Sequence, residues 1–391
     1  MDIQISDFTC QRDGMTIRGR EYRPDGKCSE AVILSHGFGG TGSDLDSYAR
    51  QLAQEGYLCL TFDFCGGSPR SSSDGSFQEM TVFTELSDLE AVMEYASGLP
   101  QVTRLMLMGC SQGGFVSALA AAAHPEKVEK LVLFYPALCI PEDSRRGQML
   151  MYSFDPSNVP ERIEAAQDPN IPFKMEPIGG EYVKCVQKMD AFAAIASYPG
   201  PVLIVHGDSD RAVNVVNSRR AQAAYHSVRP LRCQLAEITG ADHGFRGRED
   251  VHAMELVRCF LAGGTNVLSV DVVLTDCIRE ERGEETVLTI PFGGTVNTPF
   301  FQGMVQPGAA DVQRWKNEKI LRLCADYVLS GIDYTGTPCQ IHIVNENLGE
   351  GWHPTITTDS EALSFLNEAE LTESLEERRI GPMVRIFAQL P

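Results

Sequence analysis

The first two thirds of the chain alternate short apolar runs with amphipathic or polar stretches. In one such stretch large apolar residues recur at helical spacing over residues 82–93, which predicts a helix ending near Gly98. Strand, helix and strand repeated in this way predict a parallel sheet covered by helices on both faces. The runs that we interpret as strands are residues 15–22, 31–35, 57–64, 105–108, 131–135, 201–205 and 233–238.

Residues 138 to about 195 interrupt this rhythm. They are rich in Pro, Met, Asp and Arg and contain no clear buried strand, so we interpret them as an inserted cap. A helix over residues 249–262, followed by Gly263 and Gly264, ends the first domain. We therefore expect an α/β domain over residues 1–265, with the cap facing the carboxyl ends of the strands.

The pattern changes over residues 266–391. Short segments with partial alternation, such as residues 270–274, 287–290 and 341–344, are separated by turns that contain glycine and proline. This pattern predicts a second domain built from a mainly antiparallel sheet or a small β-barrel.

Composition and charge narrow the classes of partner. The chain has 391 residues, of which 43% are hydrophobic and 22% charged, as in an ordinary globular protein. Its net charge of −20 argues against nucleic acid or an anionic membrane as a partner. The amino-terminal residues lack the pattern of a signal peptide, and no apolar run approaches about 18 residues, so we expect a cytoplasmic protein.

Cysteine and histidine positions give little support to a metal site. The 12 cysteines are scattered without a C-x-x-C pair and lie mostly in apolar runs, so we interpret them as reduced core residues. The 8 histidines are also dispersed. We expect neither a metal nor another cofactor.

The most informative motif follows the apolar run at residues 105–108. Gly109-Cys110-Ser111-Gln112-Gly113 has the pattern G-x-S-x-G and precedes a run of small residues typical of a helix. A serine on a tight turn from strand to helix projects its hydroxyl above the sheet edge, and its neighbours must be small to avoid collisions. Ser111 is the candidate nucleophile, and an ordinary turn that contains serine is the alternative for this motif alone.

A glycine-rich loop over residues 36–42 follows the predicted strand 31–35. The lysine of a phosphate-binding P-loop is absent from it. Backbone N–H groups in such a loop can point towards one place. We interpret the N–H of Phe38, together with that of Gln112 just after the serine, as the two donors of an oxyanion hole.

Two later strand ends supply the candidate acid and base. Asp210 ends the pattern H-G-x-x-D after the strand 201–205, and we choose it as the acid, with Asp208 as a turn former. His243 follows the last predicted strand and is the candidate base. The competing bases His36 and His206 each lie beside a strand end, where a backbone role already explains them.

The order Ser111, Asp210, His243 is that of the α/β-hydrolase triad. Four motifs strengthen the likeness, namely Ser35-His36-Gly37-Phe38-Gly39-Gly40, Phe62-Asp63-Phe64, Ser111-Gln112-Gly113-Gly114 and Ala241-Asp242-His243-Gly244-Phe245. On these residues the chain up to about residue 263 resembles an α/β-hydrolase of the cinnamoyl or feruloyl esterase group. The resemblance implies an α/β-hydrolase fold with an inserted cap and an esterase for hydroxycinnamate esters of the feruloyl or caffeoyl type.

The cap resembles the same group over Val159-Pro160-Glu161-Arg162-Ile163, Pro172-Phe173-Lys174 and Gly179-Gly180-Glu181-Tyr182. This likeness implies that Tyr182 touches the phenol end of the substrate, with Asp143 and Gln148 as further candidates. The structural alternative for Tyr182 is packing on the sheet. Cys110 departs from the pattern of the group, in which a histidine commonly precedes the serine.

The expected reaction is the hydrolysis of a small-molecule ester through an acyl-enzyme, with His243 as base and Asp210 fixing its imidazole. The triad does not encode the leaving group, so a general short-chain acyl esterase or a thioesterase is the alternative. Outside enzymes, the alternative is a binding protein on a hydrolase scaffold.

The second domain resembles a family of small β-barrel domains of unknown function, over residues 290–296, 306–313 and 344–347. The complete fold prediction is therefore an α/β-hydrolase domain followed by a mainly antiparallel β-barrel domain. Three roles remain open for this second domain: a barrel that binds a ligand, a module for homo-oligomerisation, or a second lid over the hydrolase pocket.

Overall fold

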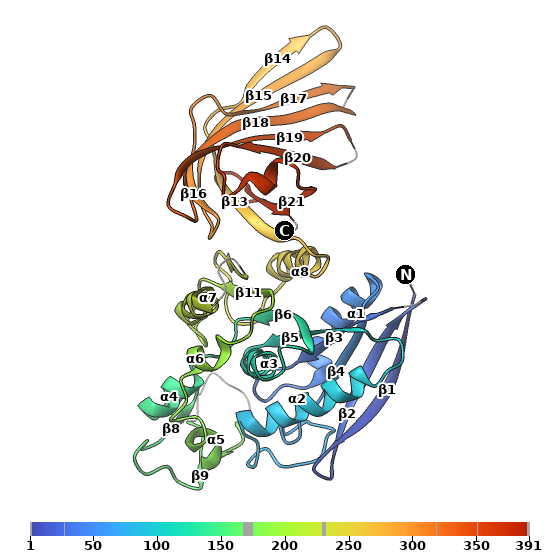
Figure 1. The fold of residues 1–391 in the computed structure, drawn as a ribbon, viewed down its shortest axis with the longest axis vertical. Helices are drawn as coiled ribbons and strands as arrows, with labels where there is room; N and C mark the ends of the chain where they lie inside the picture. The colour runs from blue at the N-terminus through green and yellow to red at the C-terminus, as the bar shows by residue number, and fades with distance from the viewer. Residues whose placement is uncertain are drawn as a thin grey trace. The chain divides into compact units, whose positions relative to one another are not determined.

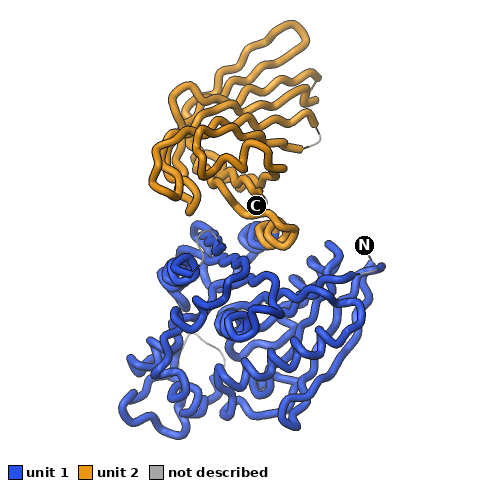
Figure 2. The backbone as a smooth tube through the Cα atoms, in the orientation of Figure 1, with its two compact units in different colours: residues 1–254 blue, residues 255–391 orange. Residues whose placement is uncertain are grey.

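The computed structural model describes residues 2–26, 28–166, 175–228, 232–317, 319–349 and 351–388. The chain forms two compact units, residues 1–254 and residues 255–391 (Figure 2). The division falls within helix α8 (Arg248–Leu261), before the boundary that the sequence predicts at residue 265.

One sheet of eight strands organises the first unit, in the order β1-β2-β4-β3-β5-β6-β11-β12. The six strands β4, β3, β5, β6, β11 and β12 pair in parallel. At one edge β1 and β2 form an antiparallel hairpin, and β2 pairs with β4 in antiparallel fashion (Figure 1). This is the α/β-hydrolase fold, as the sequence predicted. The strands are β1 (Ile3–Arg12), β2 (Met15–Pro24), β3 (Glu30–Ser35), β4 (Leu58–Phe62), β5 (Arg104–Cys110), β6 (Val128–Phe134), β11 (Val202–Gly207) and β12 (Cys233–Ile238).

Strand β1 has no counterpart among the predicted strands. It lies at the sheet edge and pairs only with β2, so most of its side chains are exposed and it needs no apolar run. Its buried side chain is Phe8, whose ring stacks on Tyr95 with centroids 4.6 Å apart. The hydrophobic pattern therefore carries little signal for this strand.

Helices cover both faces of the sheet, as predicted. Successive residues of a strand point to opposite faces. On β6, Leu133 belongs to a buried cluster with Leu89 and Phe115, whereas Phe134 contacts Tyr48, with ring centroids 5.5 Å apart. Helices α2 and α3 thus pack on one face and α1 on the other (Figure 1). The helices are α1 (Asp46–Gln54), α2 (Val82–Ser97), α3 (Gln112–Ala123) and α7 (Val216–Val228).

The predicted cap lies between β6 and β11 and consists of short elements. Within it the side chains of Tyr152 and Tyr182 are buried. The segment Pro172-Phe173-Lys174, one of those on which the resemblance rests, lies outside the described residues. The elements are α4 (Ile140–Arg146), β7 (Gln148–Met149), β8 (Tyr152–Ser153), β9 (Arg162–Ile163), β10 (Ile178–Gly179), α5 (Gly180–Lys184) and α6 (Ala191–Ile195).

The second unit contains a ten-stranded sheet in which the pairs are antiparallel, as predicted. Its main path runs β20-β19-β18-β16-β15-β13-β22-β21. In the described part of the chain no ladder joins β20 to β21, so the hydrogen bonds do not close a barrel. The strands are β13 (Thr265–Leu274), β14 (Ile278–Arg282), β15 (Glu285–Asn297), β16 (Phe301–Val305), β17 (Ala310–Lys316), β18 (Lys319–Asp333), β19 (Pro338–Asn347), β20 (Trp352–Thr358), β21 (Leu371–Glu376) and β22 (Met383–Ala388).

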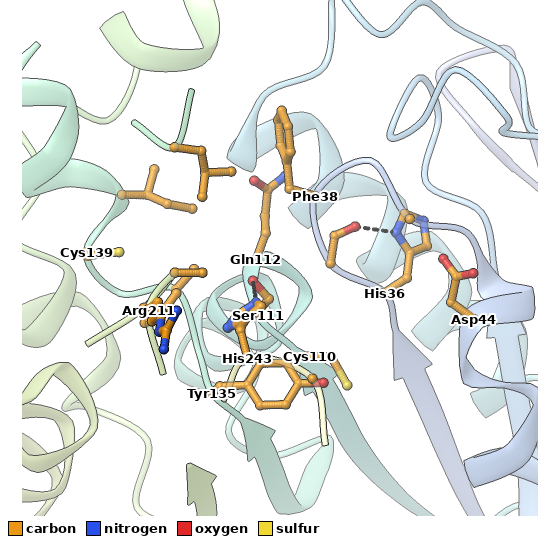
Figure 3. A pocket seen from close by; sticks show the side chains of 18 of the residues that line it. His36, Phe38, Asp44, Cys110, Ser111, Gln112, Tyr135, Cys139, Arg211 and His243 are labelled. Carbon is orange, nitrogen blue, oxygen red and sulfur yellow. Dashed lines mark hydrogen bonds between the residues drawn. The ribbon is translucent and has the colours of Figure 1, made fainter. Parts of the chain in front are cut away.

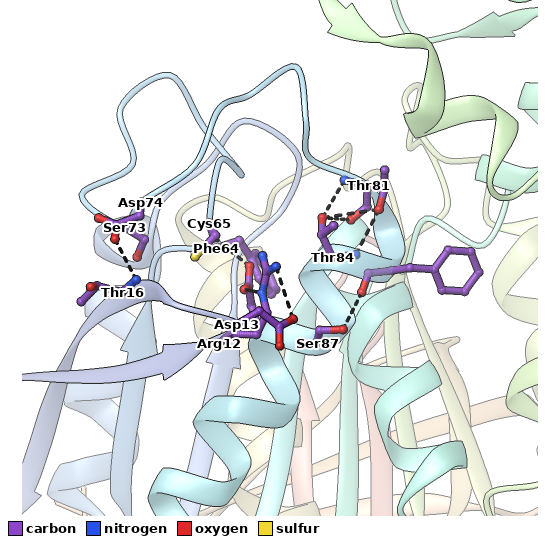
Figure 4. A network of polar contacts seen from close by, with 12 residues as sticks. Arg12, Asp13, Thr16, Phe64, Cys65, Ser73, Asp74, Thr81, Thr84 and Ser87 are labelled. Carbon is purple, nitrogen blue, oxygen red and sulfur yellow. Dashed lines mark hydrogen bonds and ion pairs between the residues drawn. The ribbon is translucent and has the colours of Figure 1, made fainter.

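Helix α2 is fixed at its start and in its middle by polar contacts (Figure 4). Thr81 caps the helix, since its hydroxyl accepts the N–H of Thr84 at 3.0 Å. Two turns further along the helix, the fully buried carboxylate of Asp88 accepts hydrogen bonds from Nε of Arg12 at 2.7 Å and from the backbone N–H of Cys65 at 2.8 Å. This ion pair joins β1 to α2, which packs against α3, the helix that follows Ser111.

We expect the substitution Arg12→Met to lower the free energy of unfolding by about 3 kcal/mol, because it leaves a buried carboxylate without its cation. Urea unfolding measures the change. The matched control is Arg20→Met, whose exposed pair with Asp46 should contribute at most about 1 kcal/mol. Adding Asp88→Asn to Arg12→Met should restore part of the loss, and equal effects at Arg12 and Arg20 would contradict this account.

Candidate active site

Ser111 stands at the turn between β5 and α3 in a strained backbone conformation, with φ 54° and ψ −117°. The glycines of the motif are required by space. A Cβ at Gly113 would lie 2.3 Å from the carbonyl oxygen of His36, and one at Gly109 would lie 2.3 Å from the carbonyl oxygen of Gly113. The tight turn that the sequence predicts around this serine is therefore present.

The three candidate triad residues lie together, although 132 positions separate Ser111 from His243. His243 Nε2 is 3.1 Å from Ser111 Oγ, and His243 Nδ1 is 2.7 Å from Asp210 Oδ2. The residues follow β5, β11 and β12, whose carboxyl ends meet at one edge of the parallel sheet. The geometry is that of a hydroxyl hydrogen-bonded to an imidazole that a carboxylate orients.

Asp210 is held as a carboxylate by its surroundings. Burial by itself would raise its pKa, but hydrogen bonds from His206, His243 and the N–H of Val213 outweigh burial and hold the pKa well below its ordinary value. Its second oxygen, Oδ1, accepts the N–H groups of Ala212 and Val213, both at 2.8 Å.

The alternative acid, Asp208, has a different place in the structure. Its Oδ1 accepts the N–H of Gly240 at 2.7 Å, in the turn that leads to His243. Asp208 thus fixes a turn, whereas Asp210, the acid chosen from the sequence, contacts the imidazole.

Both ring nitrogens of each competing histidine, His206 and His36, have hydrogen-bond partners other than Ser111. The fully buried His206 contacts Asp210 Oδ2 at 3.1 Å through Nε2 and the hydroxyl of Ser218 at 2.6 Å through Nδ1. His36 accepts the N–H of Phe64 at Nε2, 3.2 Å away, so its Nδ1–H donates to the carbonyl of Gly37 at 2.8 Å. Burial lowers the pKa of His36, which keeps this imidazole neutral.

The loop after β3 lies against the serine. A Cβ at Gly37 would be 3.1 Å from Ser111 Cβ, so a larger residue at this position would crowd the serine side chain. Gly39 donates to the carbonyl of Gly67 at 3.2 Å, which fixes the turn. Within the described residues the backbone N–H groups of Phe38 and Gln112 make no hydrogen bond, and both residues line the cavity beside Ser111.

Ser111 opens into a cavity of about 700 Å³ (Figure 3). The cavity combines aromatic, aliphatic and charged side chains from the core and from the cap. The core contributes His36, Gly37, Phe38, Gly40, Asp44, Leu45, Tyr48, Cys110, Ser111, Gln112, Tyr135, Ala137, Arg211, Ala212, Val213, His243, Gly244, Phe245 and Arg246, and the cap contributes Cys139, Ile140, Asp143, Met149, Leu150 and Tyr182.

The substrate-binding candidates differ in where they lie. Tyr182 lines the cavity with its hydroxyl donated to Gln112 Oε1. Asp143 also lines the cavity, and burial raises the pKa of its carboxyl. The expectation that Gln148 contacts the substrate is corrected by the structure, in which its side chain is exposed. Successive side chains of β7 point to opposite sides, so the neighbouring Met149 points into the cavity instead.

Sequence reasoning missed several cavity residues. Tyr135 packs its ring on the imidazole of His243, with centroids 4.5 Å apart. Tyr135 directly follows β6, at the same edge of the sheet as Ser111, and this position is the signal by which the sequence could have indicated it. Arg211 and Arg246 line the cavity from the loops that carry Asp210 and His243.

Among the described residues no group of three or more His, Cys, Asp or Glu side chains is placed to hold a metal ion. No helix in the same residues is both long and apolar enough to cross a membrane.

The chain is similar to several known hydrolases and to a quorum-quenching protein. The structure of Est1E from Butyrivibrio proteoclasticus with bound ferulic acid aligns with TM-score 0.59 and 30% identity over 65% of this chain and 98% of that chain. The quorum-quenching protein AidA of Acinetobacter baumannii (strain MDR-ZJ06) is 30% identical over 120 residues, 28% of this chain and 37% of AidA. The mouse (Mus musculus) mitochondrial palmitoyl-protein thioesterase ABHD10 is 26% identical over 204 residues, 51% of this chain and 63% of that protein.

The two curated relatives are thus each matched over less than two thirds of their own length. The family model described as serine aminopeptidase, S33, matches residues 26–249, which include the turn at Ser111 and the residues Asp210 and His243. The chain belongs to this serine aminopeptidase S33 family of α/β-hydrolases.

Proposed function

We propose that this member of an esterase-type hydrolase family is a serine carboxylic ester hydrolase that uses Ser111, His243 and Asp210. The observation that carries the proposal is the continuous hydrogen-bonded chain from Ser111 Oγ through the imidazole to the carboxylate, at 3.1 Å and 2.7 Å. It lies at the wall of a cavity large enough for a small ester.

The reaction follows from these groups. His243 Nε2 accepts the proton of Ser111 as Oγ attacks the ester carbonyl, and Asp210 holds the imidazole in the required tautomer. The N–H groups of Phe38 and Gln112 stabilise the oxyanion of the tetrahedral intermediate. His243 then protonates the leaving alcohol, and water releases the acid from the acyl-enzyme by the same steps.

Hydroxycinnamate esters of the feruloyl or caffeoyl type are the proposed substrates. Support comes from the likeness to Est1E, which was solved with ferulic acid, and from the aromatic rings of Phe38, Tyr135 and Tyr182 along the cavity. The Asp143 carboxyl, with its raised pKa, offers a hydrogen-bond partner for a phenol hydroxyl. The alternative is a general acyl esterase or thioesterase, which the similarity to ABHD10 and the apolar Met149 and Leu150 support.

The substitution Ser111→Ala is expected to remove ester hydrolysis almost completely, with a loss on the order of 10⁶ in kcat, because the triad acts as a unit. Steady-state hydrolysis of p-nitrophenyl acetate measures it. An active-site phosphonate should label Ser111 in the unmodified protein. Absence of both labelling and ester hydrolysis would favour a binding protein on a hydrolase scaffold. A Ser111→Ala variant that keeps its turnover would instead contradict the assignment of Ser111 as the nucleophile.

A matched pair of substitutions tests the acid. Asp210→Asn should lower kcat by a factor on the order of 10⁴, because the amide favours the wrong imidazole tautomer. Asp208→Asn, an equal change in a turn, should leave kcat within a few fold. The same ester assay measures both variants, and equal losses would contradict the assignment of Asp210.

A substrate panel tests the acyl specificity. Methyl ferulate and chlorogenate should be hydrolysed with a higher kcat/KM than p-nitrophenyl esters of linear acids, because the cavity rings can pack on the aromatic acid. Phe38→Leu should reduce kcat/KM for methyl ferulate more than for p-nitrophenyl acetate. Turnover confined to linear acyl esters, or to acyl thioesters, would replace the hydroxycinnamate proposal with the alternative.

A further inference from the structure

A buried chain of hydrogen bonds joins the cap to the core directly behind Gln112. Tyr182 in α5 donates its hydroxyl to Gln112 Oε1, and Gln112 Nε2 donates to Glu85 Oε2 in α2 at 2.8 Å. Each of these three side chains is 1% exposed. Both ends of the Gln112 carboxamide are therefore held, one by the cap and the other by the core.

The position of Gln112 makes this contact relevant to the reaction. Gln112 is the first residue of α3, and its backbone N–H is one of the two donors proposed for the oxyanion. The next residue, Gly113, packs so closely on the carbonyl groups of Ser35 and His36 that a Cβ there would lie within 2.4 Å of both. The Gln112 backbone is thus held on its carboxyl side by the packing of Gly113, and Tyr182 and Glu85 hold the Gln112 side chain.

Among the described residues that surround Glu85, no cationic side chain forms an ion pair with its carboxyl group. Asp88, one turn along α2, is the nearby acid, and its charge is paired with Arg12. His36 lies close to the carboxyl, since a Cβ at Gly67 would be 3.3 Å from Glu85 Oε1 and 3.2 Å from His36 Cε1. That imidazole is neutral, and the groups facing Glu85 from α3 and α5 are the neutral side chains of Gln112 and Tyr182.

Burial raises the pKa of Glu85 well above its ordinary value, although the hydrogen bond from Gln112 opposes the rise. The folded protein therefore keeps the carboxyl neutral at pH values where the unfolded chain ionises it. The stability that Glu85 contributes is therefore complete below its unfolded pKa and is lost as pH rises through its folded pKa.

We propose that Glu85 and Tyr182 are positioning residues that hold the Gln112 peptide, so that the cap and helix α2 together keep the oxyanion-binding N–H in place. This inference rests on the proposed function, because it requires that the Gln112 N–H binds the oxyanion. Two consequences follow. Loosening either contact lowers kcat rather than substrate affinity, and a neutral partner at residue 85 is sufficient for activity.

The test compares Tyr182→Phe, Glu85→Ala and Glu85→Gln with a control, Tyr198→Phe. Tyr198 is also buried, and its hydroxyl donates to the carbonyl of Val128, a residue that does not line the cavity. Tyr182→Phe keeps the ring at the cavity and removes only the hydroxyl. Thermal unfolding of every variant checks that it is folded at the assay temperature.

Tyr182→Phe and Glu85→Ala should each lower kcat for p-nitrophenyl acetate about tenfold with KM nearly unchanged, less than the 10²–10³ lost when an oxyanion donor is removed outright. The rate at which a phosphonate labels Ser111 should fall in parallel. Glu85→Gln should keep kcat near the unmodified value at pH 7. Because glutamine does not ionise, Glu85→Gln should keep its kcat and stability at alkaline pH values where ionisation of Glu85 lowers them in the unmodified protein. Tyr198→Phe should change neither kcat nor the labelling rate.

Three results would overturn the inference while leaving the proposed function intact: an unchanged labelling rate in Tyr182→Phe, an increase in KM without a fall in kcat, or a Glu85→Gln variant as impaired as Glu85→Ala. Absence of phosphonate labelling in the unmodified protein would overturn the proposed function, and this inference with it. Labelling does not depend on the natural substrate, so the test holds whichever ester the protein hydrolyses.

Discussion

The close approach of three backbone segments around Ser111 is the constraint on which the first unit depends. The β5–α3 turn, the loop after β3 and the start of α3 come together at distances that leave no room for a Cβ at Gly109 or Gly113. This packing keeps Ser111 in a strained conformation, and the strain is sustained because buried strands and helices fix the turn on both sides. The hydroxyl is thereby aimed at the imidazole before any substrate is present.

Parallel strands turn this local constraint into a site. Their carboxyl ends lie at one edge of the sheet, so residues that are distant in sequence share a small volume without long connecting segments. The loops are then tied to one another: Asp242 Oδ1 accepts the N–H of Arg211 at 3.0 Å and that of His243 at 2.8 Å. Asp210 and His243 are thus positioned by backbone contacts of their loops as well as by the hydrogen bond between them.

The cap does more than cover the cavity. Through Tyr182 it reaches the side chain of Gln112, a residue of the core whose backbone faces the serine. A likeness to feruloyl esterases assigns Tyr182 to the substrate, whereas its hydroxyl is directed to the protein. These views are compatible if the ring borders the substrate while the hydroxyl supports the oxyanion peptide, and Figure 3 shows Gln112 extending between Ser111 and Phe38.

The sequence by itself determined the features that depend on local sterics and on the period of apolar residues. These are the parallel strands and helix α2, the G-x-S-x-G turn, the cap as a break in the rhythm, and the antiparallel character of the second unit. The hydrophobic pattern did not predict strand β1, because an exposed edge strand needs no apolar pattern. Only the tertiary structure decided which polar side chains meet, because such contacts depend on loop conformation and on register between distant strands. In the structure Asp210 contacts the imidazole while Asp208 fixes a turn, and the side chain of Gln148 is exposed to solvent. Tyr135 packs on His243. Tyr182 is linked through Gln112 to Glu85.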